Sequence, residues 1–387
     1  MKELIIGQNK DTDKKYILFV DNNEILEKYD YFLDNSIEGN IYVGKVQNVL
    51  PGLQSAFINI GEKKNAFIHA RDIAPKVNIL EEEQVINKIN KEVRPGMPIL
   101  VQVKKDVTLN KGPRVTTHLN IPSRFLALMP NTNIITVSSK IEDEKEKERL
   151  IKIVRNALPE NMGAIIRTVA EGKDASIIEK DVKRVLEVWD EISNSSFEKY
   201  PAKVYERGGL IEKLLVDLVD VKLDRIVCGE EDKTRISDFL KRIGTKVPIE
   251  IDENILDKFD YKKQIKDAEN RKVWLKSGAF ITIDRTEALT AIDVNSGKYI
   301  GKDDEDETIR KVNKEAAEEI AKQLRLRDIG GIIIIDFIDM NLEKNRNDVI
   351  ENFKKFVKKD RSKVQIEQFT TLNLMELTRK HVNSKNN

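Results

Sequence analysis

Short apolar runs separated by polar turns fill the N-terminal part of the chain. The segments ELIIGQ, KYILFV and EILEKY predict three strands, and Asp21-Asn22-Asn23 predicts a tight turn between the last two. Residues 1–36 are too few to fold alone. We therefore expect a later part of the chain to complete their sheet.

Five further strand-like runs lie between residues 39 and 119: IYVGKVQNV, SAFINI, NAFIHA, PILVQVKK and RVTTHLN. Glycines separate several of them, and short strands with glycine turns are typical of a small β-barrel. Between the third and fourth runs, residues 79–92 are acidic and favour a helix. The pattern predicts a barrel inserted into the first sheet.

The middle of the chain mixes strands and helices. FLALMP and AIIRTVA predict strands, IEDEKEKERL predicts a solvated helix face, and residues 174–193 carry an apolar stripe at helical spacing. Helices near 209–219 and 231–243 flank the strand RIVCG. This second α/β unit is the expected partner of the N-terminal strands.

From residue 275 onward, strands and helices alternate. GAFITIDRT, ALTAIDVN, GGIIIIDFIDM and KVQIEQF predict strands, and residues 305–326 and 344–358 predict helices. The alternation predicts an α/β domain covered by helices. The unbroken apolar run before Asp336 predicts a strand buried on both faces.

Composition narrows the function classes. The 387 residues carry a net charge of only +1, so any surface for nucleic acid must come from local clustering. The single cysteine, Cys228, excludes an intramolecular disulfide and a cysteine-rich zinc site. No signal core and no run of roughly 18 apolar residues is present, so we expect a cytoplasmic protein without a membrane span.

Two predicted strands end in carboxylates. Asp293 closes an apolar strand, with Asn295 two residues on and therefore on the same face, and Asp336 follows four isoleucines. Paired carboxylates without a nearby histidine suit Mg²⁺, which takes oxygen ligands and can activate water. The pattern alone leaves open that each Asp only caps a helix or ends a strand in solvent.

Other catalytic designs find little support. A histidine-based mechanism would have to draw on His69, His118 and His381, and no P-loop or dinucleotide fingerprint is present. In the predicted barrel, Phe57 and Phe67 lie among basic residues, where they could stack on bases or simply be core.

Lys111 and the pair Arg167–Thr168 each allow a functional and a purely structural interpretation. Lys111 lies in a turn, where it would contact phosphate or be solvated. Arg167 and Thr168 end a strand, where they would bind phosphate or lie on the surface.

Longer motifs resemble a known family. KVWLKSGAFITIDRTEALTAIDVNSGKYIGK and EAAEEIAKQLRLRDIGGIIIIDFIDM look like the catalytic core of the ribonuclease E/G family, nearest to its ribonuclease G branch. GNIYVGKVQNVLPGLQSAFINIGE resembles its S1-type domain, and IIRTVAEGK resembles its 5′-end sensor. The resemblance extends across nearly the whole chain.

The resemblance implies an architecture. Residues 1–36 and 209–275 would form the two parts of a split RNase H-like sheet, and residues 37–119 an S1-type OB-fold domain that binds RNA. Residues 120–208 would form the 5′-sensor region, and residues 276–387 a DNase I-like α/β catalytic domain.

The resemblance also implies site residues and an activity. Asp293 and Asp336 match the magnesium-binding aspartates, with Asn295 in support. Phe57, Phe67 and Lys111 match the RNA contacts, and Arg167 and Thr168 the pocket for a 5′-monophosphate. The implied activity is internal cleavage of single-stranded, AU-rich RNA to 5′-phosphate and 3′-hydroxyl ends, in ribosomal RNA processing and messenger RNA decay.

Two departures from the family pattern stand out. The chain stops at Asn387, before the CPxCxG-type motif through which two family chains share a zinc ion. We therefore expect no zinc in this chain, which would be a fragment or a short variant, and a homodimer or higher oligomer would form without that link. Ser139 and Lys140 stand where an arginine pair is common near the sensor, which would soften the 5′-end preference. The alternative functions are a non-catalytic RNA-binding protein and, third, cleavage of DNA.

Overall fold

The computed structural model describes residues 1–31, 36–74, 89–106, 112–195, 199–218, 223–297 and 305–383. The chain forms two compact units, each of which draws on distant segments. The first comprises Met1–Phe32, Lys222–Arg235 and Val247–Asn387, and the second Leu33–Val221 and Ile236–Lys246. Within the described ranges, no helix is long and apolar enough to cross a membrane.

A five-stranded sheet in the first unit joins the N-terminal strands to a later segment. Its strands, in order, are β15 (Ile249–Ile251), β14 (Arg225–Cys228), β1 (Lys2–Asn9), β2 (Lys14–Asp21) and β3 (Glu24–Tyr31). The turn before β3 uses Asn22 and Asn23 at φ 49° and 65°, a left-handed conformation that asparagine tolerates. Strand β1 pairs in parallel with β14, which confirms that the later segment completes the N-terminal sheet.

A closed five-stranded barrel forms part of the second unit. Its strands are β4 (Ile41–Leu50), β5 (Ser55–Asn59), β6 (Ala66–His69), β8 (Arg114–Thr116) and β7 (Pro98–Lys105). Pairing of β4 with β7 closes it, and β13 (Ala202–Tyr205) adds to the outside of β4. Position 44, inside the barrel, is occupied by glycine because a Cβ there would lie only 2.5 Å from Ile58 Cγ2. Of the expected helix at 79–92, only α1 (Ile89–Glu92) falls within the described residues.

A four-stranded sheet with two long helices adjoins the barrel in the second unit. The sheet order is β11 (Ile135–Val137), β12 (Gly163–Ile166), β10 (Leu126–Met129) and β9 (Ile121–Pro122). Helix α3 (Ala175–Ser193) buries its apolar stripe against this sheet. The charged residues of helix α2 (Glu144–Ala157) are exposed or half-buried, as predicted, and Glu146 also accepts a 2.8 Å hydrogen bond from the Gly172 backbone. Helices α4 (Leu210–Leu218) and α5 (Glu230–Arg242) follow along the chain.

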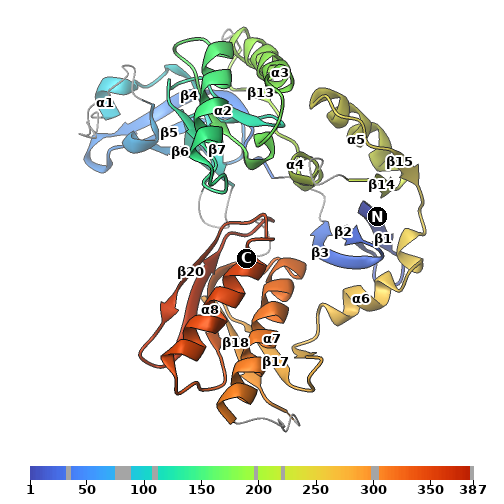
Figure 1. Ribbon diagram of the computed structural model, residues 1–387. Helices are drawn as coiled ribbons and strands as arrows, with labels where there is room; N and C mark the ends of the chain where they lie inside the picture. The colour runs from blue at the N-terminus through green and yellow to red at the C-terminus, as the bar shows by residue number, and fades with distance from the viewer. Residues whose placement is uncertain are drawn as a thin grey trace. The chain divides into compact units, whose positions relative to one another are not determined.

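A six-stranded sheet forms most of the first unit. Its order is β16 (Lys272–Trp274), β17 (Phe280–Arg285), β18 (Leu289–Asn295), β19 (Gly331–Asp336), β21 (Leu374–Arg379) and β20 (Val364–Phe369). Helices α7 (Glu305–Leu326) and α8 (Glu343–Val357) lie side by side on one face (Figure 1), and α6 (Tyr261–Asp267) precedes the sheet. The sheet begins before the expected domain start at 276, and the sequence pattern did not predict β21.

The prediction that β19 is buried on both faces is wrong. Ile333 and Ile335 are fully buried against α7 and α8, whereas Ile332 is 51% exposed and Ile334 half-buried. The other strands alternate in the same way, as in β18, where Ile292 is buried. The described helices therefore cover one face, and the opposite face is open to solvent.

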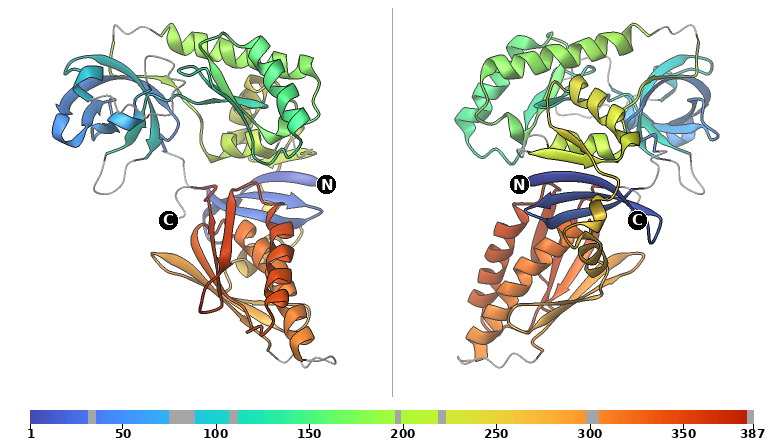
Figure 2. Two further views of the ribbon diagram at one scale, coloured as in Figure 1. Left: turned by 60° about the vertical axis from the view of Figure 1, so that its left-hand side comes forward. Right: turned by 90° about the vertical axis from the view of Figure 1, so that its right-hand side faces the viewer.

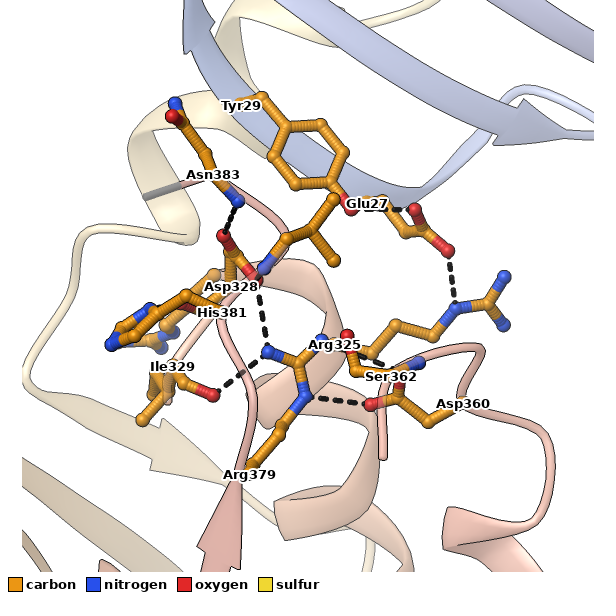
Figure 3. Close-up of polar contacts among 12 residues, drawn as sticks. Glu27, Tyr29, Arg325, Asp328, Ile329, Asp360, Ser362, Arg379, His381 and Asn383 are labelled. Atoms are coloured by element: carbon orange, nitrogen blue, oxygen red, sulfur yellow. Dashed lines mark hydrogen bonds and ion pairs between the residues drawn. The ribbon is translucent and has the colours of Figure 1, made fainter. Parts of the chain in front are cut away.

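Buried ion pairs connect β3 to the region of α7 and β20. The carboxylate of Glu27, fully buried, accepts hydrogen bonds from Tyr29 Oη at 2.7 Å and Arg325 Nε at 2.7 Å (Figure 3). It also pairs with Arg361 at 2.6 Å. Burial raises the pKa of Glu27, but the Arg361 and Arg325 charges outweigh burial and hold the pKa below its ordinary value. Figure 2 shows the N-terminal strands beside the end of α7, where these pairs form.

A second buried pair lies next to the first (Figure 3). Arg379 donates to Asp328 at 2.9 Å and to Asp360 at 2.7 Å, and all three side chains are buried. Asp328 also accepts the backbone N–H groups of Val382 and Asn383 at 3.0 and 2.8 Å. These bonds compensate the burial of the charges and fix the chain after β21.

Candidate active site

The two aspartates predicted from separate strands are direct neighbours. Strands β18 and β19 are parallel and adjacent, and their register places Asp293 opposite Asp336. Both are the outward members of alternating strands, so their side chains lie on the open face of the sheet. The structure therefore brings together the two carboxylates that the sequence analysis singled out.

Asn295 belongs to the same cluster. Its Nδ2 donates a hydrogen bond to Asp293 Oδ2, two residues back along β18. This bond fixes the orientation of the carboxylate. Asp339, three residues past Asp336, is exposed.

The negative charges of this cluster are not balanced within the described structure. No described residue forms an ion pair with Asp293 or Asp336. Partial burial, and the nearby charges of Asp293 and Asp339, raise the pKa of Asp336 above its ordinary value. A raised carboxyl pKa between like charges is the electrostatic condition that a bound cation relieves.

The donor set fits a hard divalent cation. Two carboxylates and one amide are oxygen donors of the kind Mg²⁺ prefers, and Mg²⁺ keeps several waters rather than a full protein shell. The described residues contain no group of three or more His, Cys, Asp or Glu side chains that could hold a metal. A site of two carboxylates with water ligands is nevertheless of the kind that Mg²⁺ uses.

Cationic residues border the carboxylates on the side of β16. Arg271 donates to both oxygens of Asp284, at 2.5 and 2.6 Å. Hydrogen bonding to Asp284, and to a smaller degree the charge of Asp293, raises the pKa of Arg271. Arg271 and the next residue, Lys272, therefore place two cations at this edge of the sheet, of which Arg271 is paired with Asp284.

The two barrel phenylalanines are not core. Phe57 and Phe67 are cross-strand partners in β5 and β6, with ring centroids 6.0 Å apart in an edge-on arrangement. Both are half-buried, whereas their neighbours Ala56 and Ile58 are fully buried. The pair lies on the outer surface of the barrel, and Lys111 lies outside the described residues.

Arg167 and Thr168 adjoin in sequence but make separate contacts. Arg167 forms an ion pair with Asp217 and donates to the Ser123 carbonyl at 3.3 Å. Thr168 Oγ1 shares a 2.8 Å hydrogen bond with Ser138 Oγ. Without a ligand, each side chain is thus held by partners of its own.

Arg167 lines a cavity of about 310 Å³ in the second unit. Three further arginines contribute to its lining: Arg184, Arg207 and Arg242. The sequence analysis missed these three, because they come from segments far apart in the chain.

His381 and the single cysteine lie away from the carboxylates, in buried polar and apolar surroundings. His381 Nδ1 lies 3.1 Å from the Asp328 carbonyl, within the buried polar cluster of Figure 3. Cys228 is fully buried, and burial raises its pKa to about 11. Such a thiol is neither a nucleophile nor a metal ligand near neutral pH.

Comparison with known proteins agrees with the resemblance of the motifs. A sequence model of the Ribonuclease E/G family matches residues 120–382. Ribonuclease G of Escherichia coli is 41% identical over 357 residues, which are 89% of this chain and 73% of that protein. Ribonuclease G of Haemophilus influenzae is 38% identical, over 89% of this chain and 72% of that protein. Ribonuclease E of Nostoc sp. is 38% identical, over 88% of this chain and 51% of that protein. The chain thus belongs to the ribonuclease E/G family.

Proposed function

We propose that this chain is a magnesium-dependent endoribonuclease whose metal is held by Asp293 and Asp336. The observation that carries the proposal is their register, which places two uncompensated carboxylates side by side on an open sheet face. The relatives named Ribonuclease G and Ribonuclease E support RNA as the substrate.

The reaction is hydrolysis of a phosphodiester. A water oxygen forms a bond to phosphorus, the bond from phosphorus to O3′ breaks, and a proton from the water ends on O3′, which leaves a 5′-phosphate and a 3′-hydroxyl. Mg²⁺, when bound, would supply an activated water and stabilise the charge that develops on the phosphate.

The residues around the site have distinct tasks. Asp293 and Asp336 would hold the ion, and the amide of Asn295 keeps Asp293 in place. Lys272, beside the Asp284-bound Arg271, would offer positive charge to the RNA backbone. The open face leaves room for an extended strand, which favours single-stranded RNA over a folded substrate.

The second unit would bind the RNA. We propose that the barrel is an S1-type domain, in which Phe57 and Phe67 stack on bases and Lys111 contacts the backbone. We also propose that Arg167 and Thr168 sense a 5′-monophosphate; the arginine-lined cavity supports an anion near Arg167. From the resemblance to the family we further propose AU-rich substrates, roles in ribosomal RNA processing and messenger RNA decay, and a cytoplasmic location. We also propose that the five-stranded sheet is RNase H-like and that the six-stranded sheet is DNase I-like, as the resemblance to the family implies.

A cleavage assay tests the proposal. The purified chain is incubated with Mg²⁺ and a 5′-monophosphorylated, AU-rich oligonucleotide, and the product ends are identified by mass. Internal cuts with 5′-phosphate and 3′-hydroxyl ends are expected, and a parallel DNA oligonucleotide should stay intact. Binding without any cut at high protein concentration would instead favour a non-catalytic RNA-binding protein, for which the outward Phe57–Phe67 pair is the supporting observation.

A further inference from the structure

The open face of the six-stranded sheet carries two rows of side chains across its strands. In one row, Lys272, Thr282 and Asp293 are successive cross-strand partners, and Asp336 continues it on β19. In the next, Trp274, Phe280 and Asn295 are successive partners. Directly paired residues of neighbouring strands share a face. Trp274 and Phe280 therefore lie on the same face as the carboxylates.

Trp274 is more exposed than a residue with a packing role. It is 61% exposed, although tryptophan is usually well covered. Val273, which alternates with it, packs against the core of the unit instead. The Trp274 ring stands edge-on to Phe280, with the ring centroids 5.2 Å apart. Two aromatic rings are thus displayed on the open face without covering any core.

A lysine completes this group. Lys272 Nζ lies 4.0 Å from the centroid of Trp274 and 3.5 Å from that of Phe280. Its positive charge is held over the rings, beside the cationic Arg271. Phe280 is half-buried, so Trp274 is the ring that remains open to a base. An exposed aromatic ring combined with cations is the arrangement by which proteins bind single-stranded nucleic acid without reading its sequence.

The group is next to the reactive centre. Neighbouring strands lie ~4.8 Å apart, so Phe280 is about one strand spacing and Trp274 about two from Asn295. Trp274 and Lys272 also border a cavity of about 460 Å³, whose lining combines polar residues such as Gln264 with apolar ones such as Leu326. There is therefore space beside the ring for a planar group.

We propose that Trp274, Phe280 and Lys272 form a subsite that stacks one base of single-stranded RNA beside the phosphodiester to be cut. The inference rests on the proposed function, since it assigns a substrate position at that same site. Stacking accepts any base, so the subsite would hold the strand on the sheet face without adding sequence preference.

Tryptophan fluorescence tests the subsite without any cleavage. Trp189 is the only other tryptophan, so the Trp189→Phe variant reports on Trp274 alone. The variant is titrated in EDTA with an AU-rich RNA oligonucleotide and with an abasic oligonucleotide of equal length. Saturable quenching by the first and not by the second is expected. Equal quenching by both, or by neither, would overturn the proposal.

Binding measured by anisotropy gives a second readout. Trp274→Ala should weaken RNA binding roughly tenfold, and Trp274→Phe should restore most of it. Ile332→Ala is the matched control, because Ile332 is an exposed apolar side chain of the same face that cannot stack. The proposal would be overturned if Ile332→Ala lost as much RNA affinity as Trp274→Ala. It would also be overturned if the Trp274 fluorescence changed with protein concentration alone, because a second copy of the chain would then cover the face.

The two proposals fail separately. If the chain does not cleave RNA but shows base-dependent quenching, the subsite stands and the catalytic assignment falls. If wild-type protein cleaves RNA and Trp274 is not quenched, the subsite falls alone. With Mg²⁺, Trp274→Ala should raise KM and leave kcat nearly unchanged, because the residue acts on binding rather than on the reacting bond.

Discussion

Asp293 lies directly across from Asp336 in the parallel pair of β18 and β19, and the proximity of Asp293 helps to raise the pKa of Asp336. A structure without a cation must tolerate this repulsion. The site is therefore arranged for binding at the expense of stability, as is common where function requires uncompensated charge.

Replacing Asp336 by Asn should stabilise the metal-free protein. The folded-state pKa of Asp336 is raised, so its contribution to stability is fully present below the unfolded pKa of about 3.9 and is lost as the pH rises through the folded pKa. At neutral pH the wild-type carboxylate is thus destabilising, and the amide removes this effect. Thermal unfolding in EDTA should show a higher Tm for the variant.

With Mg²⁺ present, the wild-type protein should instead have a higher Tm than the Asp336→Asn variant. At a hundredfold excess over its Kd, a ligand stabilises the folded state by about 2.7 kcal/mol. Wild-type protein should gain this stabilisation and Asp336→Asn should gain little. A variant that melts lower than wild type in EDTA, or that responds equally to Mg²⁺, would contradict the assignment.

Removal of Glu27 should destabilise the first unit strongly. Glu27→Ala leaves Arg325 and Arg361 without their buried carboxylate, and loss of one member of a buried ion pair costs about 3–5 kcal/mol. Glu24→Ala is the control, since its pair with Lys322 is exposed and contributes about 0–1 kcal/mol. Urea unfolding at pH 7 measures both.

The difference in stability cost between Glu27→Ala and Glu24→Ala should become smaller at acidic pH. The pKa of Glu27 is lowered in the folded state, so its stabilisation is present above the unfolded pKa of about 4.3 and lost as the pH falls through the folded pKa. Equal costs for the Glu27 and Glu24 variants at pH 7 would show that the buried pairs do not hold the unit together.

Phe57→Ala should weaken RNA binding by roughly tenfold and leave folding intact. The reason is its place on the outer surface of the barrel, opposite Phe67. Ile58→Ala provides the contrast, because Ile58 is fully buried and its truncation costs about 2–5 kcal/mol of stability. If Phe57→Ala unfolds the barrel as readily as Ile58→Ala, Phe57 is a packing residue.

Arg167→Gln should narrow the rate difference between 5′-monophosphorylated and 5′-hydroxylated substrates. The guanidinium lies at an arginine-lined cavity, and its loss removes the planar donor that suits phosphate. Lys152→Gln, a charge removal on the exposed side of α2, is the control and should leave the difference unchanged. If Arg167→Gln kept the same rate difference between the two substrates as wild type, Arg167 would have no role in sensing the 5′ end.

Much of the site could be predicted from sequence because it follows strand periodicity. Period two places Asp293 and Asn295 on one face, and the apolar run before Asp336 marks a strand end. The register that joins the aspartates is a long-range pairing that no local pattern encodes. The four isoleucines could not reveal that only one face of β19 is covered, since that depends on where α7 and α8 pack.

Other features escaped prediction for similar reasons. Strand β21 alternates buried residues with polar ones such as Glu376, and it ends in the buried Arg379, so its pattern is weak. The partner of Arg167, Asp217, comes from a helix distant in sequence. The sequence does show two aromatics, Trp274 and Phe280, shortly before the carboxylate strand, but only the register of β16 and β17 reveals that they are neighbours.

The most direct test of the central claim is single-turnover cleavage of an AU-rich RNA oligonucleotide by wild type, Asp293→Asn, Asp336→Asn and Asp339→Asn in Mg²⁺. A metal ion contributes several kcal/mol to such a reaction, so loss of either ligand should slow it by roughly a thousandfold. Asp339 is nearby and exposed, and its variant should keep most of the activity. Near-normal rates for Asp293→Asn or Asp336→Asn, in variants shown to be folded, would contradict the account.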